Sequence, residues 1–378
     1  MHSRRIARAL LPALCVVSLS ACLGPRPRVP SPSAAQPSLP AARCGNGVCQ
    51  GVESSTNCPA DCPQTPTTQP PLPTAASLSA IGTGVVYLGV MVPLEGWEDD
   101  KNQARFQAHV AQIRNAAELF ERYGGKLTLE SKEVTDGILR WGDNVLLEME
   151  QRGHGVGVHA DLGGSMQDDC ADLAPALRTE RLQLESLGVR VRHVSGNLSH
   201  CDWIAATIDA GYSFTTGIVA YGVMSMPAAN RPPEYRNCKS PAACHDVFPP
   251  ELEDRLHPWR PASGSDWLTH DPNSKLVILA SDGGIACAQE GAGQQEGQSC
   301  TFDQADIPAL TQALGQALAL ATPDQVNILY FSWSLGSPLD PALLEAWLKA
   351  VEPYVQAGRV QWRTLPEMYD AYVAWEVG

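Results

Sequence analysis

Short apolar segments alternate with amphipathic segments along the chain from about residue 80 to residue 378. The apolar runs, which predict strands, are 85–92, 126–129, 155–159, 189–194, 212–216, 275–280, 326–333 and 360–362. The segments with helical spacing of apolar residues are 102–123, 138–152, 173–187, 202–210, 307–321 and 341–357. Strands that alternate with helices pair in parallel, so this pattern predicts an α/β fold with a parallel sheet or barrel. In such folds the chemistry lies at the carboxyl ends of the strands.

A Pro-rich stretch at about 220–271 interrupts the alternation and contains Cys238 and Cys244. We expect a long insertion here that lies over one face of the domain. A single large domain can hold about 300 residues. The sequence therefore predicts one domain over 80–378, with this insertion inside it.

Residues 1–21 have the features of a bacterial secretory signal, with a basic start followed by a short apolar core. The core runs into Leu19-Ser20-Ala21-Cys22, which resembles a lipobox. This resemblance implies cleavage before Cys22 and attachment of lipid to that residue. Leu23 follows the cysteine in place of Asp, which favours the outer membrane. We therefore expect an exported protein that reaches the membrane only through its lipid anchor.

Three short segments separate the signal from the domain. Residues 22–43 are rich in Pro, Ser and Ala and predict an extended tether. Residues 44–62 carry closely spaced cysteines and resemble a small Cys-rich repeat of bacterial surface proteins, which needs disulfides to hold its shape. A second linker, rich in Pro and Thr, covers 63–79.

The cysteine content and the charge limit the classes of partner. Export makes disulfides the expected state of most of the 12 cysteines, although their pairing stays open. The formal net charge is −14, from 41 acidic and 27 basic residues. This excess of acidic groups argues against nucleic acid or anionic lipid as a ligand. We expect a monomer.

The segment from Gly153 to Asp161, with the sequence GHGVGVHAD, is the strongest candidate for a functional strand. Residues two apart on an extended backbone point the same way, so His159 and Asp161 project together from its carboxyl end. An imidazole and a carboxylate in this arrangement can hold a divalent metal or transfer a proton. A hydrogen-bonded structural histidine is the alternative.

This segment resembles the second motif of the polysaccharide deacetylases, the carbohydrate esterases of the NodB-homology kind. In that family a strand ends in two metal-binding histidines. Here His159 takes the first place and Gly163 the second. The resemblance implies a distorted (β/α)7-type barrel, preceded in this chain by the disulfide-rich module, and a divalent metal, expected to be zinc.

Two further motifs match the family in part. The segment Val92 to Gly96 corresponds to the family's first motif, with Glu95 at the metal-ligand position and Leu94 where a catalytic base is expected. The segment Arg192 to Gly196 corresponds loosely to the third motif. The late histidine of the family is missing near Ser332. The chain therefore resembles a divergent member.

The resemblance implies metal-dependent removal of acyl groups from a cell-envelope or environmental polysaccharide. Glu95 and His159 are the expected metal ligands, and Asp161 or a later histidine is a third ligand. Asp161, His193 and Asp202 are the candidates for acid or base catalysis. Asp202 could instead cap the helix that follows it.

Other residues are candidates for substrate binding. They are Trp97, Glu130, Ser195, His257, Trp259 and Arg260. Aromatic faces and guanidinium groups suit sugars, although a packed lid explains His257, Trp259 and Arg260 equally well.

Two other functions remain open. A catalytically degenerate barrel could bind glycan without hydrolysis. A glycoside hydrolase would need two carboxylates across a groove, and Glu95 with Glu130 is the only obvious pair at strand ends.

Overall fold

The computed structural model describes residues 83–95, 98–162, 169–238, 244–280, 282–285, 304, 306–332 and 340–378. All of them belong to a compact unit that spans 71–378. The signal segment with Cys22, both tethers and the Cys-rich module lie outside the described residues, so these assignments stay predictions. Within the described part of the chain, no helix is both long enough and apolar enough to cross a bilayer.

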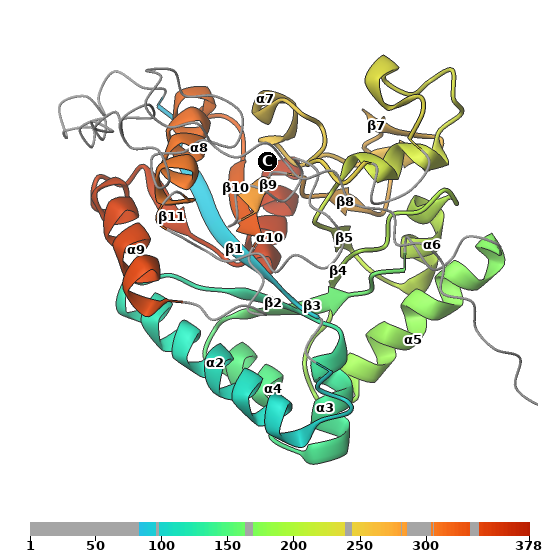
Figure 1. The fold of residues 1–378 in the computed structure, drawn as a ribbon. Coiled ribbons are helices and arrows are strands. Elements are labelled where there is room, and N and C mark those ends of the chain that lie inside the picture. Colours follow the sequence, from blue (N-terminus) through green and yellow to red (C-terminus); the bar gives the residue numbers. More distant parts are fainter. Residues whose placement is uncertain are drawn as a thin grey trace, which may run out of the picture. The chain divides into compact units, whose positions relative to one another are not determined.

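One sheet of parallel strands forms the centre of this unit (Figure 1). Its strands are β1 (Val86–Leu94), β2 (Thr128–Ser131), β3 (Gly155–His159), β4 (His193–Ser195), β5 (Phe214–Thr215), β8 (Val277–Ile278), β9 (Asp282–Ile285), β10 (Asn327–Ser332) and β11 (Val360–Trp362). They are ordered β8-β5-β4-β3-β2-β1-β10-β9, and β11 pairs with the first half of β1.

The two ends of this strand order are joined by the chain itself. β8 pairs with β5, and only a few residues later β9 pairs with β10. Among the described strands the order stays open between β8 and β9, so the sheet curls into a distorted, incompletely closed barrel. The predicted (β/α)7-type barrel is confirmed.

Helices cover the outer face of the sheet (Figure 1). They are α2 (Gln103–Arg122), α3 (Glu133–Trp141), α4 (Val145–Gln151), α5 (Leu173–Glu185), α6 (Trp203–Ala210), α8 (Asp306–Leu320) and α9 (Pro341–Gln356). In α2 the side chain of Asn102 caps the first turn, and Phe106, Ile113 and Phe120 are buried at the spacing that the sequence shows.

The predicted helix at 138–152 is wrong in its extent, because this segment holds parts of two helices. α3 ends before Gly142, and α4 begins after Asn144. Gly142 has a φ of 82° and Asp143 a φ of 55°, and these left-handed residues break the helical path. Asn144 then caps α4 by accepting from the backbone N–H of Leu147 at 3.1 Å.

The C-terminal helix α10 (Leu365–Glu376) fills the amino end of the barrel. It begins where the backbone N–H of Leu365 donates to the hydroxyl of Thr128, the first residue of β2, at 2.9 Å. Met368 packs with Phe214 and Tyr330 from the inner face of the sheet. A Cβ at Gly89 would lie 2.8 Å from the backbone oxygen of Arg363 and 2.8 Å from the Cε of Met368, so β1 needs glycine at this point.

The region between β5 and β8 contains short elements in place of regular αβ units. They are 3-10 helices at Ala220–Ser225 and Pro233–Tyr235, α7 (Leu252–Arg255) and the hairpin of β6 (Pro261–Ser263) and β7 (Asp266–His270). Trp267 is completely buried and anchors the hairpin against Trp203 and Phe248. The disulfide between Cys238 and Cys244 closes a local loop in this region.

A second disulfide joins Cys170 to Cys201. It ties the segment after β3 to the segment after β4, so it braces two of the connections that leave the carboxyl end of the barrel. Cys287 and Cys300 lie outside the described residues.

Candidate metal centre

Three predicted residues converge at the carboxyl ends of β1 and β3. Glu95 directly follows β1, His159 is the last residue of β3, and Asp161 lies two positions further. One ligand atom from each of the three lies within 4.8 Å of the others. Oε2 of Glu95 lies 3.3 Å from Nε2 of His159.

The donor set fits a divalent metal. Zinc lies about 2.0–2.2 Å from nitrogen and oxygen ligands, so two ligands of a tetrahedral site are roughly 3.3–3.6 Å apart. Glu95 and His159 already have this separation. The second ring nitrogen of His159 is also engaged, because Nδ1 lies 2.7 Å from the hydroxyl of Ser195. Metal-binding histidines show this arrangement in general.

The backbone at Asp161 adopts an unusual conformation at the point where its side chain approaches Glu95 and His159. Its φ is 46°, in the left-handed region that few residues other than glycine adopt. Gly196, at the end of β4, packs directly against it, since a Cβ there would lie 2.5 Å from the backbone nitrogen of Asp161. Asp161 is therefore held by the neighbouring strand end, while its side chain stays 54% exposed.

Lys132 lies among these carboxylates, and the sequence interpretation did not include it. Its Nζ lies 2.5 Å from Oδ2 of Asp161 and 3.5 Å from Oε2 of Glu95. Lys132 immediately follows β2, so its place at a strand end was the signal that could have identified it. In this structure an ammonium group balances the negative charge of both carboxylates.

These contacts shift the pKa values of the site. Burial alone would raise the pKa of Glu95, but the hydrogen bond to His159 and the charges of His159 and Lys132 lower the pKa to about 2. Burial alone would lower the pKa of His159, yet the hydrogen bond and the charge of Glu95, with the charge of Glu130, raise it above its usual value. Without a metal, each of these two groups therefore favours the charged form of the other.

A second polar layer lies deeper in the barrel, below His159. Ser195 donates a hydrogen bond to Oε2 of Glu130, and Thr216 donates to Oε1 of the same carboxylate at 2.6 Å. Glu130 and Thr216 are 0% exposed and Ser195 is 1% exposed. The prediction that Glu130 and Ser195 contact substrate therefore does not hold, because neither side chain reaches the surface.

The predicted catalytic role of His193 also conflicts with its burial. His193 is 0% exposed and stacks on Phe214, with ring centroids 4.6 Å apart. A Cβ at Gly157 would lie 2.2 Å from Nε2 of His193. The glycine in β3 thus makes room for the imidazole inside the barrel, where no substrate can touch it.

Asp202 has the capping role that the sequence left open. Its side chain accepts a hydrogen bond from the backbone N–H of Ala205 at 2.9 Å, at the start of α6. Among the described residues, no contact joins Asp202 to Glu95 or His159, so its candidacy as an acid or base has no geometric support.

The remaining candidates from the insertion lie at the wrong end of the barrel. His257 Nδ1 lies 3.1 Å from the backbone oxygen of Val326, just before β10 begins. Trp259 pairs with Ile278 of β8, and Arg260 forms an ion pair with Glu376 at 2.7 Å. Among the described residues, these three contact the start of β10, β8 and α10, and none of them contacts Glu95, His159 or Asp161. Trp97 lies outside the described residues.

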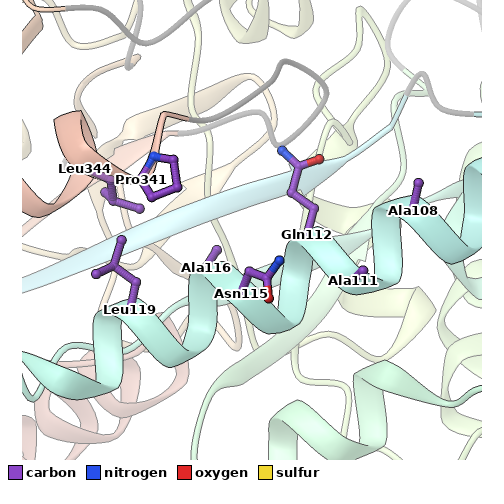
Figure 2. A pocket seen from close by; sticks show the side chains of 8 residues that line it. All are labelled: Ala108, Ala111, Gln112, Asn115, Ala116, Leu119, Pro341 and Leu344. Carbon is purple, nitrogen blue, oxygen red and sulfur yellow. The ribbon is translucent and has the colours of Figure 1, made fainter.

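A shallow pocket on the outside of the barrel is a separate feature. Figure 2 shows Gln112, Asn115 and Leu119 of α2 facing Pro341 and Leu344 of α9. None of the described residues that line it has an ionisable side chain, so they offer no group for the expected chemistry.

Comparisons with known proteins give similarity at low identity. No protein-family model and no curated protein matches the chain. A solved structure assigned to the polysaccharide deacetylases, from Mycobacterium smegmatis, has a TM-score of 0.46 and 11% identity, over 78% of this chain and 92% of that one. A 4-alpha-glucanotransferase from Thermococcus litoralis has a TM-score of 0.44 and 12% identity, over 76% of this chain and 40% of that one.

A peptidoglycan N-acetylglucosamine deacetylase is also similar, with a TM-score of 0.31 and 11% identity over 78% of this chain and 95% of that one. The barrel fold assigned above rests on the strand pairing of the chain itself.

Proposed function

We propose that this chain is a metal-dependent hydrolase that removes N- or O-acyl groups, such as acetyl, from a cell-envelope or environmental polysaccharide. The observation that carries the proposal is the convergence of Glu95, His159 and Asp161 at the carboxyl end of the barrel. The sequence resemblance to polysaccharide deacetylases supplies the substrate class.

Each side chain has a role in this proposal. Glu95 and His159 would hold the ion, expected to be zinc. Asp161 would complete the donor set with one carboxylate oxygen, and its second oxygen would accept a proton from the attacking water. A bound divalent metal supplies a water of lowered pKa and polarises the acyl carbonyl. Lys132 can donate a hydrogen bond to the acyl oxygen as negative charge develops there.

One observation favours the alternative, a barrel that binds glycan without hydrolysis. The ammonium of Lys132 already pairs with both Asp161 and Glu95. A cation supplied by the protein itself would stabilise the two carboxylates without any metal. In either case we propose an exported monomer, anchored through lipid on Cys22 to the outer membrane.

Metal content separates these two functions. We expect about one zinc per chain in the purified full chain, none in His159→Ala, and an unchanged content in His245→Ala, a control with an exposed histidine that is not among the converging residues. If the wild-type protein takes up no metal from excess zinc, the hydrolase is excluded and glycan binding becomes the better proposal. Acetate release from chitin and peptidoglycan fragments then tests activity in a protein that holds metal.

A further inference from the structure

A continuous line of hydrogen bonds runs from His159 into the centre of the barrel. Nδ1 of His159 lies 2.7 Å from the hydroxyl oxygen of Ser195, and that hydroxyl donates to Glu130. The residues come from three adjacent strands, β3, β4 and β2, whose pairing sets their spacing. This line ends at a carboxylate that no solvent reaches.

The directions of the hydrogen bonds determine where His159 carries its proton. An ionised carboxylate only accepts, and a serine hydroxyl has a single proton to donate. Because Ser195 gives its proton to Glu130, its oxygen can only accept from His159. Nδ1 of His159 must therefore carry a proton. The lone pair of the neutral ring then lies on Nε2, the nitrogen that faces Glu95.

Glu130 accepts a hydrogen bond on each of its two oxygens, Oε2 from Ser195 and Oε1 from Thr216. The hydroxyl of Thr216 lies 2.6 Å from Oε1, and Nε2 of His193 lies 3.2 Å from that same oxygen. A buried carboxylate is stable only with such partners. The hydrogen bonds of Glu130 thus decide that Ser195 accepts from Nδ1 of His159.

We infer that Glu130, acting through Ser195, is a positioning residue that fixes the tautomer and the ring orientation of His159, so that Nε2 faces the metal position beside Glu95. This inference rests on the proposed metal centre for its purpose, but the tautomer can be observed without any metal. Ser195 does not act as a nucleophile beside His159, because its side chain is 1% exposed and committed to Glu130.

The first test reads the tautomer in the metal-free full chain, by nitrogen-15 NMR of the histidine rings at a pH where His159 is neutral. We expect the proton on Nδ1 in the wild type. In Ser195→Ala we expect the proton to move to Nε2 or to exchange between both nitrogens. A wild-type His159 with its proton on Nε2 would overturn the inference, whatever the variants do.

The second test measures zinc affinity by competition with a chelator. Loss of an outer-shell partner typically weakens metal binding by about 10–100-fold, so we expect this loss in Ser195→Ala and a loss in the same direction in Glu130→Gln. The control is Thr215→Val, which removes another completely buried hydroxyl. That hydroxyl forms hydrogen bonds with the backbone oxygen of Val194 and with Oδ1 of Asn197. We expect that variant to keep wild-type affinity.

The two tests distinguish their failures. If the wild type binds no zinc, the proposed function fails, while the tautomer still reports on Glu130 and Ser195. The positioning role is refuted if zinc binds, if Ser195→Ala and Glu130→Gln match Thr215→Val in affinity, and if both keep the wild-type tautomer. Thermal unfolding of each variant shows whether the fold is retained. If Ser195→Ala does not fold, Glu130→Gln still tests the hydrogen bonds from Glu130 through Ser195 to His159.

Discussion

The two ends of the barrel are built by the same strands but carry opposite chemistry. At the carboxyl end, Glu95, Asp161 and Lys132 are partly exposed and paired through charge. At the amino end, Met368 and Tyr372 of α10 are buried in an apolar cluster. The open end can therefore hold an ion and a substrate, while the filled end supplies packing. Substitutions should separate these two contributions.

The largest change in stability is expected at the filled end. Met368→Ala removes a side chain that is 0% exposed and leaves a cavity under the barrel. Such substitutions cost about 2–5 kcal/mol in the free energy of unfolding. Urea unfolding measures this cost, and metal content should stay at the wild-type level.

Val377→Ala is the control, because Val377 is 85% exposed and lies just past α10. Exposed substitutions usually change stability by less than about 0.5 kcal/mol. If Met368→Ala were no less stable than this control, α10 would not be the packing element that closes the amino end.

A smaller loss is expected between the two ends, where β3 passes His193. Gly157→Ala would place a methyl group 2.2 Å from the imidazole. Overpacking of this kind costs about 1–3 kcal/mol. The same substitution at Gly315 in α8 meets nothing within 4 Å and should stabilise the protein slightly, since alanine favours a helix.

The two glycine variants can be compared in one thermal unfolding experiment. Opposite shifts in Tm are the expected result. Equal shifts would mean that His193 moves aside without cost, and that the glycines of β3 are not required by the inner layer.

At the open end, Lys132→Met should raise metal affinity. The ammonium occupies the carboxylates that the ion would use, and an ion pair of this exposure is worth up to about 1 kcal/mol. That energy corresponds to roughly a several-fold gain in zinc affinity. Lys126→Met is the matched control, because Lys126 precedes β2 at the filled end and pairs with Glu367.

Zinc titrations of both lysine variants make this comparison direct. A gain that appears equally in Lys126→Met would reflect net charge, and would remove the specific competition assigned to Lys132. Acyl hydrolysis should fall in Lys132→Met if its ammonium also assists the reaction.

The smallest effect is expected from pH in the metal-free protein. The pKa of Glu95 is lowered to about 2, so its contribution to stability is present above its usual value near 4.5 and is lost as the pH falls toward 2. The pKa of His159 is raised, so its share is present below its usual value and is lost as the pH rises through the raised one. Solvent weakens both, because Glu95 is 39% exposed.

Thermal unfolding with a chelator present measures this effect. The difference in Tm between wild type and Glu95→Gln should be largest near pH 5–6 and should shrink below the ordinary carboxyl pKa of about 4.5. A difference that does not change with pH would show that Glu95 and His159 do not interact as an ion pair.

Much of the barrel could be predicted from periodicity alone. The strand at 155–159 and the helices that begin near 103, 173 and 341 match their predicted positions, because each has a clear apolar period and a polar start or a glycine stop. The meeting of Glu95 and His159 also followed from the rule that parallel strands end at one edge. β9 and α10 were missed, since β9 is short and α10 follows the last strand without a further strand to frame it.

Only the tertiary structure decided which polar residues reach the surface. Both faces of a parallel barrel strand are buried, one against helices and one against the interior, so periodicity does not distinguish the inside from the outside. Glu130 and His193 therefore looked like surface groups at strand ends, although both lie in the closed interior. Lys132 lies in the site because of the path of the turn after β2. Arg260 lies outside it because this part of the insertion folds toward α10. The sequence carries the order of the strands and the chemistry of their ends, but the depth of each side chain follows from how the barrel closes.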